Sequence, residues 1–323
     1  MVGRRKLYLF PILTMLQILK KIILVILLVI VIDKVFTFLF TNYIFTNTLS
    51  GESGGSINYV IQKVRNPDFL ILGPSRAKHG IDPAQLTALG NGYNLGINGT
   101  TVLNSELVLD ILIRNNVRPK TVILSADLSD YGEDKRSDML DQLKKVYPYD
   151  TPLIKKYVQK LGYVEEAKYF FGLYRYNRKI ANIGFNFLKR NTINNGNGYV
   201  GLPDMKDLPE HDYHPENFIY VKESTNAQAL KHIQQICEEN NIKLIVVFSP
   251  SYQNAYYNEA QQKLMIDDLK QEDITVIDLS NINTHPELNS KQYWRDALHF
   301  NASGAEAFSK ILNTEIKNLL SRK

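Results

Sequence analysis

Apolar residues near the N-terminus form one long stretch that is interrupted once. Ile22 to Ile32 is unbroken aliphatic, Asp33 and Lys34 follow, and apolar residues resume from Val35 to Phe45. The segment from Ile22 to about Ile44 is long enough to cross a bilayer, which takes about 20 helical residues. We therefore predict an N-terminal transmembrane helix.

The charged pair is the main objection to this helix. A charge at mid-membrane costs about 2.5 to 3.5 kcal/mol, whereas each aliphatic side chain returns about 0.3 to 0.6 kcal/mol. The balance is therefore near even if both charges sit at the centre. A span shifted toward Leu16, or a Lys34 side chain that snorkels to the interface, lowers the cost.

The distribution of basic residues predicts the orientation of the helix. Basic residues precede the apolar stretch, and none lies between Lys34 and Lys63. The positive-inside rule then keeps the N-terminus in the cytoplasm and places the rest outside it, in a periplasm or at the cell surface. A cleaved signal peptide is the alternative, but no small-x-small cleavage site follows, so we favour an uncleaved anchor. A buried soluble helix is disfavoured because the flanking charges are one-sided.

Beyond the anchor, short apolar runs alternate with helical patterns. Runs typical of buried strands occupy residues 68–73, 92–96, 120–127, 242–249 and 274–280. Helical spacing is found over residues 81–90, 102–116, 224–240, 254–271 and 302–320. This alternation predicts an α/β domain with a five-stranded parallel sheet and helices on both faces.

Composition divides the chain into three parts. Residues 1–46 form the cytoplasmic N-terminus and anchor, the Ser/Gly-rich residues 47–58 resemble a flexible linker, and residues 59–323 form the domain. An insertion at about 131–220 interrupts the strand–helix alternation, with an aromatic, helical first half and a loop-like second half. We interpret it as a lid or a partner surface. Its aromatic residues are more often a small core of their own than a substrate platform.

Composition also excludes some classes of function. The chain has 323 residues, and its net charge of +5 gathers at the two ends, without a basic stripe interleaved with aromatics, so a nucleic-acid partner is not expected. Cys237 is the only cysteine, which leaves no disulfide framework and no cysteine-based zinc site. We expect neither a metal nor a cofactor.

Ser75 follows the first predicted strand, where open α/β sheets bind ligands. A turn or helix-capping serine is the competing interpretation. Near the C-terminus, Asp296 precedes His299 by three residues, on a short loop that leads into the last helix. This spacing could let the carboxylate hold one ring nitrogen while the other faces a serine hydroxyl, as in a catalytic triad. The remaining histidines lack this setting: His79, His211, His214, His232 and His285. For His211 and His214 we favour a surface role, with a metal site as the alternative that their spacing leaves open.

The stretch 93–101 is the third candidate element. Its glycines, Gly96 and Gly99, permit a tight turn and a close approach to a ligand. The amide of Gly99 could point at a developing oxyanion beside the amide of Ser75. A plain strand-to-helix turn is an equally good interpretation of this piece alone.

Three motifs, taken in order, resemble the SGNH (GDSL-like) hydrolase superfamily. They are Gly73–Ser75 after the first strand, Asn94–Gly99 at the end of the second, and Asp296–His299 before the last helix. The resemblance covers about Asp68 to the C-terminus, apart from the insertion. It implies a three-layer, flavodoxin-like fold.

The resemblance also implies roles for single residues. Ser75 would be the nucleophile, His299 the base and Asp296 the group that orients it. The oxyanion hole would combine the amides of Ser75 and Gly99 with an asparagine.

Two departures from the family pattern affect this assignment. Gly73–Arg76 replaces the usual Gly-Asp-Ser-Leu block and is more similar to the membrane-anchored branch of DltD-like and alginate-acetylation proteins. The Gly-x-Asn-Asp block after the third strand is missing; Ser125, Asp127 and Ser129 stand there, and a carboxylate would repel an oxyanion. We take Asn98 as the candidate for the third donor.

Together these features favour a membrane-anchored, extracytoplasmic serine esterase or O-acyltransferase. By resemblance, its substrate would be an acylated cell-envelope polysaccharide or sugar, with acetyl as the expected group. The alternative is a catalytically silent binding partner of a polytopic membrane O-acyltransferase, with the insertion as docking surface. A secreted lipase is disfavoured because both the cleavage site and the full Gly-Asp-Ser-Leu block are missing.

Overall fold

A computed structural model describes residues 6–189, 197–204 and 214–321, with side chains from Thr14 on. Its centre is one sheet of five parallel strands in the order β2-β1-β3-β4-β5. The strands are β1 (Phe69–Leu72), β2 (Gly92–Asn94), β3 (Thr121–Ala126), β4 (Lys243–Phe248) and β5 (Thr275–Asp278). The predicted α/β class and the five parallel strands are confirmed. The strand order reverses between β1 and β3, which places a switch point at the end of β1.

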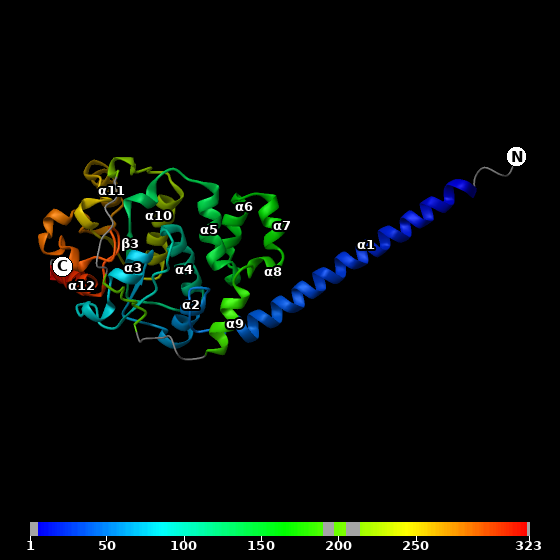
Figure 1. Cartoon of the computed structure of the whole chain (residues 1–323), viewed down its shortest axis with the longest axis horizontal. Coiled ribbons are helices and arrows are strands. Elements are labelled where there is room, and N and C mark those ends of the chain that lie inside the picture. The colour runs from blue at the N-terminus through cyan, green and yellow to red at the C-terminus, as the bar shows by residue number, and fades with distance from the viewer. Residues whose placement is uncertain (1–5, 190–196, 205–213, 322–323) are drawn as a thin grey trace.

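Helices cover both faces of the sheet (Figure 1). Side chains alternate along β1, so that Leu70 and Leu72 join one core and Phe69 and Ile71 the other. The first core is completed by α4 (Val102–Arg114), α10 (Thr225–Glu239) and α11 (Glu259–Gln271), and the second by α3 (Ser75–Gly80) and α12 (Ala302–Ser321).

Two predicted helices differ from the structure. Residues 81–90 form only a 3₁₀ turn, Pro83–Gln85, because the Asp82 carboxylate accepts the amide of Ala84 and closes a local turn. The short helix of this region is instead α3, which begins at Ser75. Helix α11 begins at Glu259 rather than near residue 254, because the preceding backbone turns left-handed at Gln253 and Asn254.

The insertion forms a small helical body beside the sheet (Figure 1). It consists of α5 (Arg136–Val146), α6 (Pro152–Lys160), α7 (Tyr163–Tyr169), α8 (Gly172–Arg175) and α9 (Ile180–Leu188). Tyr147 and Tyr169 are buried in edge-to-face contact, with ring centroids 4.8 Å apart. Part of the aromatic stripe therefore builds the insertion's own core. A role as lid or partner surface stays a prediction.

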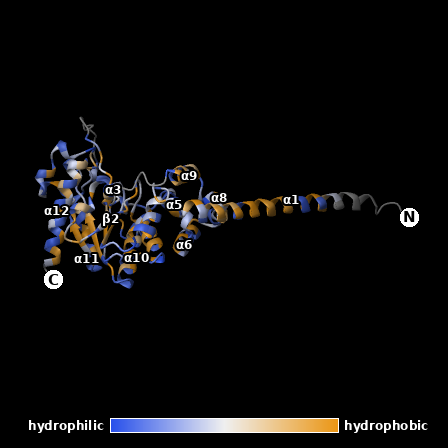
Figure 2. Ribbon diagram, turned by 90° about the horizontal axis from the view of Figure 1, so that it is seen from below, coloured by the Kyte–Doolittle hydropathy of each residue, from blue (hydrophilic) through white to orange (hydrophobic). Residues whose placement is uncertain are grey.

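Helix α1 (Lys6–Leu39) continues as a π-helical turn, Phe40–Phe45, and projects from the domain (Figure 1). By length and composition, Thr14–Phe45 could cross a membrane. The hydropathy colouring in Figure 2 shows this helix as apolar over most of its described length. Its orientation, and the division of the chain into three parts, stay predictions.

Residues 47–58 are packed rather than extended as a flexible linker would be. They contact the π-helical turn Phe40–Phe45 and α9. Thr48, Ser50 and Asn58 are buried. The amide group of Asn58 donates to the carbonyls of Phe45 (2.7 Å) and Thr48 (3.1 Å). The helix α2 (Gly55–Tyr59) begins within this stretch.

Candidate active site

Ser75 stands at a sharp strand-to-helix turn. Strand β1 ends at Leu72, Gly73 adopts a φ of +141°, and Ser75 is the first residue of α3. A side chain at Gly73 would come within 2.6 Å of the Ser125 carbonyl, so this turn requires glycine. The turn leaves the Ser75 side chain partly exposed, beyond the carboxyl end of β1.

His299 and Asp296 lie on the loop before α12, which is held from both ends. Trp294 is buried, bridges to Phe300 across the loop, and donates its indole N–H to the carbonyl of Leu288 at 2.7 Å. The loop is therefore a packed structure rather than a mobile connection.

The three side chains form a continuous chain of hydrogen bonds. Ser75 Oγ lies 2.7 Å from His299 Nε2, although the two residues are 224 positions apart. His299 Nδ1 lies 2.9 Å from both Asp296 carboxylate oxygens. The predicted residues are thus brought together, and their catalytic role stays a prediction.

The carboxylate of Asp296 is held in its charged form. Burial raises its pKa, but the hydrogen bond and charge of His299, with the backbone amides of Leu298 and His299, outweigh burial and lower the pKa below its usual range. Both amides donate to Asp296 Oδ1 at 2.8 Å. An ionised Asp296 requires a proton on Nδ1, so that Nε2 of the neutral ring is free to accept the Ser75 proton.

The site is open enough to admit a substrate. The His299 side chain is 21% exposed and that of Asp296 is 43% exposed. Both exposed fractions are larger than those of a polar network buried in a protein core, which a ligand could not reach.

The predicted oxyanion donors differ in their availability. Gly99 occupies the left-handed region with φ +63°. Within residues 6–189, 197–204 and 214–321, the amides of Ser75 and Gly99 donate no hydrogen bond, so both could receive a ligand oxygen. The Asn98 side chain is already engaged: its NH₂ donates to Glu52 at 2.9 Å, and its oxygen lies 2.9 Å from His79 Nε2. Asn98 would have to leave Glu52 to act as the third donor.

Arg76 is a residue whose role the sequence did not reveal. Its buried guanidinium pairs with Asp127 and donates to the carbonyls of Ser249 (2.7 Å) and Pro250. Arg76 therefore joins the residues that follow β1, β3 and β4. It also neutralises the carboxylate that stands where the family pattern has asparagine. The unusual arginine directly after the serine was the one signal for this pair.

A second histidine lies close to the first. The ring centroids of His79 and His299 are 6.3 Å apart, and His79 Nδ1 lies 2.7 Å from the Val200 carbonyl oxygen. Glu52, from the stretch before α2, receives Asn98 and also pairs with Lys78. The stretch that follows α1 and its π-helical turn thus contacts the turn that carries Gly99.

The other histidines make contacts away from Ser75. His232 pairs with Glu106 between α10 and α4. His214 lies 2.9 Å from Glu216, and His285 lies 3.5 Å from Glu287. His211 lies outside the described residues.

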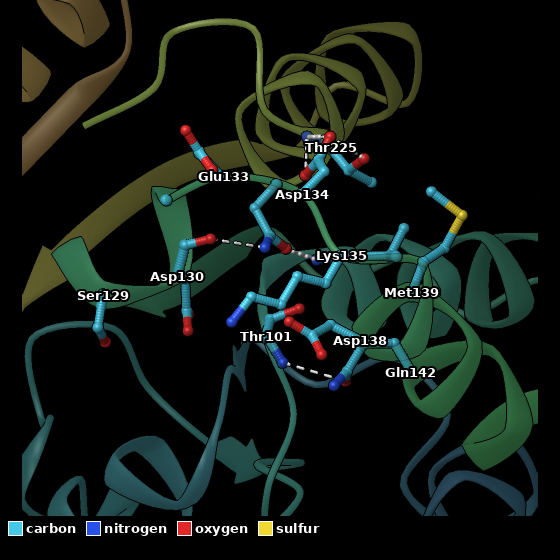
Figure 3. Close-up of a pocket in the computed structure, with 13 residues that line it drawn as sticks. Thr101, Ser129, Asp130, Glu133, Asp134, Lys135, Asp138, Met139, Gln142 and Thr225 are labelled. Atoms are coloured by element: carbon cyan, nitrogen blue, oxygen red, sulfur yellow. Dashed lines mark hydrogen bonds between the residues drawn. The ribbon is translucent and has the colours of Figure 1, made fainter. Parts of the chain in front are cut away.

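A polar pocket of about 380 Å³ lies beside Thr101, two residues after Gly99 (Figure 3). It begins at Thr101 and includes Ser129 and Asp130, which follow β3. Figure 3 shows further carboxylates around it, of which Asp134 accepts the Thr225 amide at 2.8 Å. Its apolar lining consists of Leu103 and Met139. Hydrogen-bonding groups thus dominate this pocket.

Asp130 is the most perturbed carboxyl group of this pocket. Its Oδ2 is buried and, within the described part of the chain, has no hydrogen-bond partner. Burial and the neighbouring charge of Asp127 raise the pKa of Asp130 well above its usual range, and Arg76 partly offsets them. Asp130 thus favours its neutral form more strongly than an exposed aspartate does.

Comparisons with known proteins leave the family of this chain open. No family model matches the sequence, and no curated protein matches it. Among solved structures, one similar chain is from Bacteroides fragilis and is described as a "putative acylhydrolase". It is 12% identical, with a TM-score of 0.36 over 81% of this chain and 94% of that chain. A score of this size does not establish a common fold, so the chemistry of the site rests on its own geometry.

Proposed function

We propose that this protein is an SGNH-type serine esterase or O-acyltransferase, anchored by α1 with its domain outside the cytoplasm. One observation carries the proposal: Ser75, His299 and Asp296 form an unbroken chain of hydrogen bonds at the carboxyl edge of a parallel sheet. A serine needs an adjacent base, and the base needs an orienting group, to become a nucleophile.

In the first half-reaction His299 acts as the base. Its Nε2 takes the proton of Ser75 Oγ as the oxygen bonds to the acyl carbon of an ester. The amides of Ser75 and Gly99 donate to the developing oxyanion. The ester C–O bond then breaks, the leaving alkoxide takes the proton from His299, and the acyl group stays on Ser75.

In the second half-reaction an acceptor hydroxyl replaces the leaving group. His299 removes the proton of the acceptor, the new oxygen bonds to the acyl carbon, and the Ser75–acyl bond breaks. The proton returns to Ser75 Oγ. Water as acceptor makes the protein an esterase, and a sugar hydroxyl makes it an acyltransferase.

The strand order supports the assignment to this family. The order 2-1-3-4-5 is that of flavodoxin-like sheets, whose ligands bind at the switch point beside β1. The ion pair of Arg76 and Asp127 supports it further, since a paired carboxylate repels an oxyanion far less than an isolated one.

The proposed substrate is an acetylated sugar of a cell-envelope polysaccharide. The resemblance to the anchored branch of the family suggests it. The polar lining of the pocket beside Thr101 fits hydroxyl groups better than a long acyl chain.

A serine-directed fluorophosphonate probe tests the proposal on the full chain. The wild type should be labelled, and Ser75→Ala should lose labelling by a factor of at least about 10³. Ser321→Ala, which removes an exposed serine at the end of α12 and outside this pocket, is the matched control and should be labelled normally. Equal labelling of the wild type and Ser75→Ala would exclude Ser75 as the nucleophile.

The engaged Asn98 favours a second candidate function. Because the NH₂ group of Asn98 donates to Glu52, only the backbone amides of Ser75 and Gly99 remain as donors to an oxyanion. A silent partner of a polytopic membrane O-acyltransferase would need no third donor. An unlabelled wild type that binds such an enzyme through its insertion would support this second function.

A further inference from the structure

The charged pair near the C-terminal end of α1, Asp33 and Lys34, has partners in the insertion. Asp33 is buried, and its carboxylate accepts the backbone amides of Gly172 (3.0 Å) and Leu173 (2.9 Å) at the start of α8. Lys34 donates to the carbonyl of Phe170, and its Nζ lies 3.6 Å from the centroid of that ring. Asp33 and Lys34, whose charges disfavour a membrane-spanning helix, therefore bind the insertion to α1.

The contact continues along one face of the anchor. Thr37 faces Gly172 so closely that a Cβ at Gly172 would meet Thr37 Oγ1 at 1.7 Å. Farther along, Phe40 packs edge-to-face on Tyr176, with centroids 4.9 Å apart, and Thr41 Oγ1 hydrogen-bonds to the Tyr176 hydroxyl at 2.7 Å. The insertion is thus fixed to α1 at a defined height.

That height coincides with the edge of a bilayer. Helix α1 is exposed from Thr14 to Ile32, with partial cover only at Ile30, and this stretch is about 28 Å long at 1.5 Å per residue. The hydrocarbon layer of a bilayer is about 30 Å thick. Contact with the insertion begins at the next residue, Asp33. This stretch includes Lys20 and Lys21, whose side chains snorkel toward the cytoplasmic interface. It corresponds to the span shifted toward Leu16, since a span from Ile22 would place the insertion deeper in the bilayer.

The insertion presents apolar side chains at this height. Phe170 and Leu173 flank Asp33 and Lys34, yet they are 52% and 44% exposed. Lys168 and Arg178, a few residues to either side, are exposed as well. Exposed aromatic and aliphatic residues beside basic ones are typical of surfaces that rest in the headgroup region.

We infer that the α7–α8 segment, residues 163–175, rests in the outer interface of the bilayer that α1 crosses, with Phe170 and Leu173 among the lipids. This inference depends on the proposed membrane anchoring. The partner of this surface is lipid, because the α7–α8 segment packs on α1, whose own exposed apolar side chains require lipid as their surroundings. Two membrane contacts, α1 and the α7–α8 segment, would together fix the orientation of the domain above the membrane.

Quenching by brominated lipids tests the inference. The full chain is reconstituted in phosphatidylcholine vesicles, with a thiol-reactive fluorophore at Phe170→Cys or Leu173→Cys. Cys237 is buried, so it does not compete for the label. Leu24→Cys in α1 reports the anchor, and Leu264→Cys on α11, where the leucine is 57% exposed, is the matched control.

We expect labels at 170 and 173 to be quenched at least about twofold more than the label at 264. Quenching at 24 but not at 170 or 173 would overturn the interfacial docking while the anchor stands. The same result with labels at 170 and 173 shielded from aqueous iodide would mean that a protein covers this surface, which also overturns it. An unquenched label at 24 would overturn both the anchor and the docking.

Discussion

At the scale of single residues, Asp296 determines which nitrogen of His299 can act as a base. Its carboxylate accepts the ring N–H and two backbone amides, so that its charge and its position are both fixed. The lowered pKa keeps it ionised at neutral pH.

The substitution Asp296→Asn should therefore slow fluorophosphonate labelling of Ser75 by about 10² to 10⁴-fold, because the tautomer of His299 is no longer fixed. The exposed Asp141→Asn, which lies outside the pocket of Figure 3, is the control and should label at the normal rate. Because the pKa of Asp296 is lowered, its contribution is present above the unfolded value of about 3.9 and is lost only as the pH falls through the lower folded value. Labelling should thus show no titration of Asp296 between about pH 5 and 8.

Asp130 should behave in the opposite way. Its raised folded pKa, caused first by burial and then by Asp127, means that stability is highest at low pH and falls as the pH rises from about 3.9 through the folded value. We expect Asp130→Asn to raise the free energy of unfolding at pH 7 by at least about 1 kcal/mol, and to leave it unchanged near pH 3. Urea titrations at the two pH values, with Asp138→Asn as control, measure this. An equal effect at both values would contradict it.

Local spacing allowed us to predict which three side chains meet at the site, but not the contacts that hold the surrounding loops in place. Asp296 and His299 are three residues apart, and Ser75 follows an apolar run, so each could be picked from a short stretch. Arg76 and Asp127 are 51 positions apart, and nothing in either stretch shows that the two side chains meet.

At the scale of elements, Arg76 connects the carboxyl ends of three strands. Replacing it by methionine should lower the free energy of unfolding by about 3 to 5 kcal/mol, because Asp127, whose side chain is only 15% exposed, would keep a charge without a partner. Adding Asp127→Asn removes that charge, so the double variant should lose less than Arg76→Met alone. Denaturant unfolding of the two single variants and the double variant gives the coupling energy. Additive losses would show that the pair does not stabilise the edge of the sheet.

Buried strands were the elements that the sequence predicted best. Parallel strands covered on both faces appear as continuous apolar runs, and all five predicted runs contain a strand. The helix expected over residues 81–90 failed because the hydrogen bond of Asp82 to a nearby amide outweighed a weak apolar spacing.

At the scale of the whole molecule, α1 and the insertion pack together as one unit. Gly172→Ala should disrupt their contact, since a Cβ there would meet Thr37 Oγ1 at 1.7 Å, and overpacking costs about 1 to 3 kcal/mol. Gly184→Ala, in the interior of α9 with nothing within 4 Å, is the matched control and should be neutral or stabilising by up to about 1 kcal/mol.

Thermal unfolding in detergent and protease cleavage within residues 136–188 measure both variants. Faster cleavage of Gly172→Ala alone is the expected result. Identical behaviour of the two variants would mean that the anchor does not stabilise the insertion. Hydropathy could not predict this contact, because Asp33 and the amide of Gly172 are 139 positions apart.

The docking of α1 on the insertion limits how a water-soluble fragment can be cut from this chain. A fragment that starts at residue 47 would lose Asp33, Phe40 and Phe45. The amides of Gly172 and Leu173 would then lack their acceptor, and the ring of Tyr176 would be open to water. A fragment that starts near Ile32 keeps these contacts and omits most of the exposed apolar part of α1, Thr14 to Ile32. Crystallisation or assay of the detached domain should therefore begin from the longer fragment.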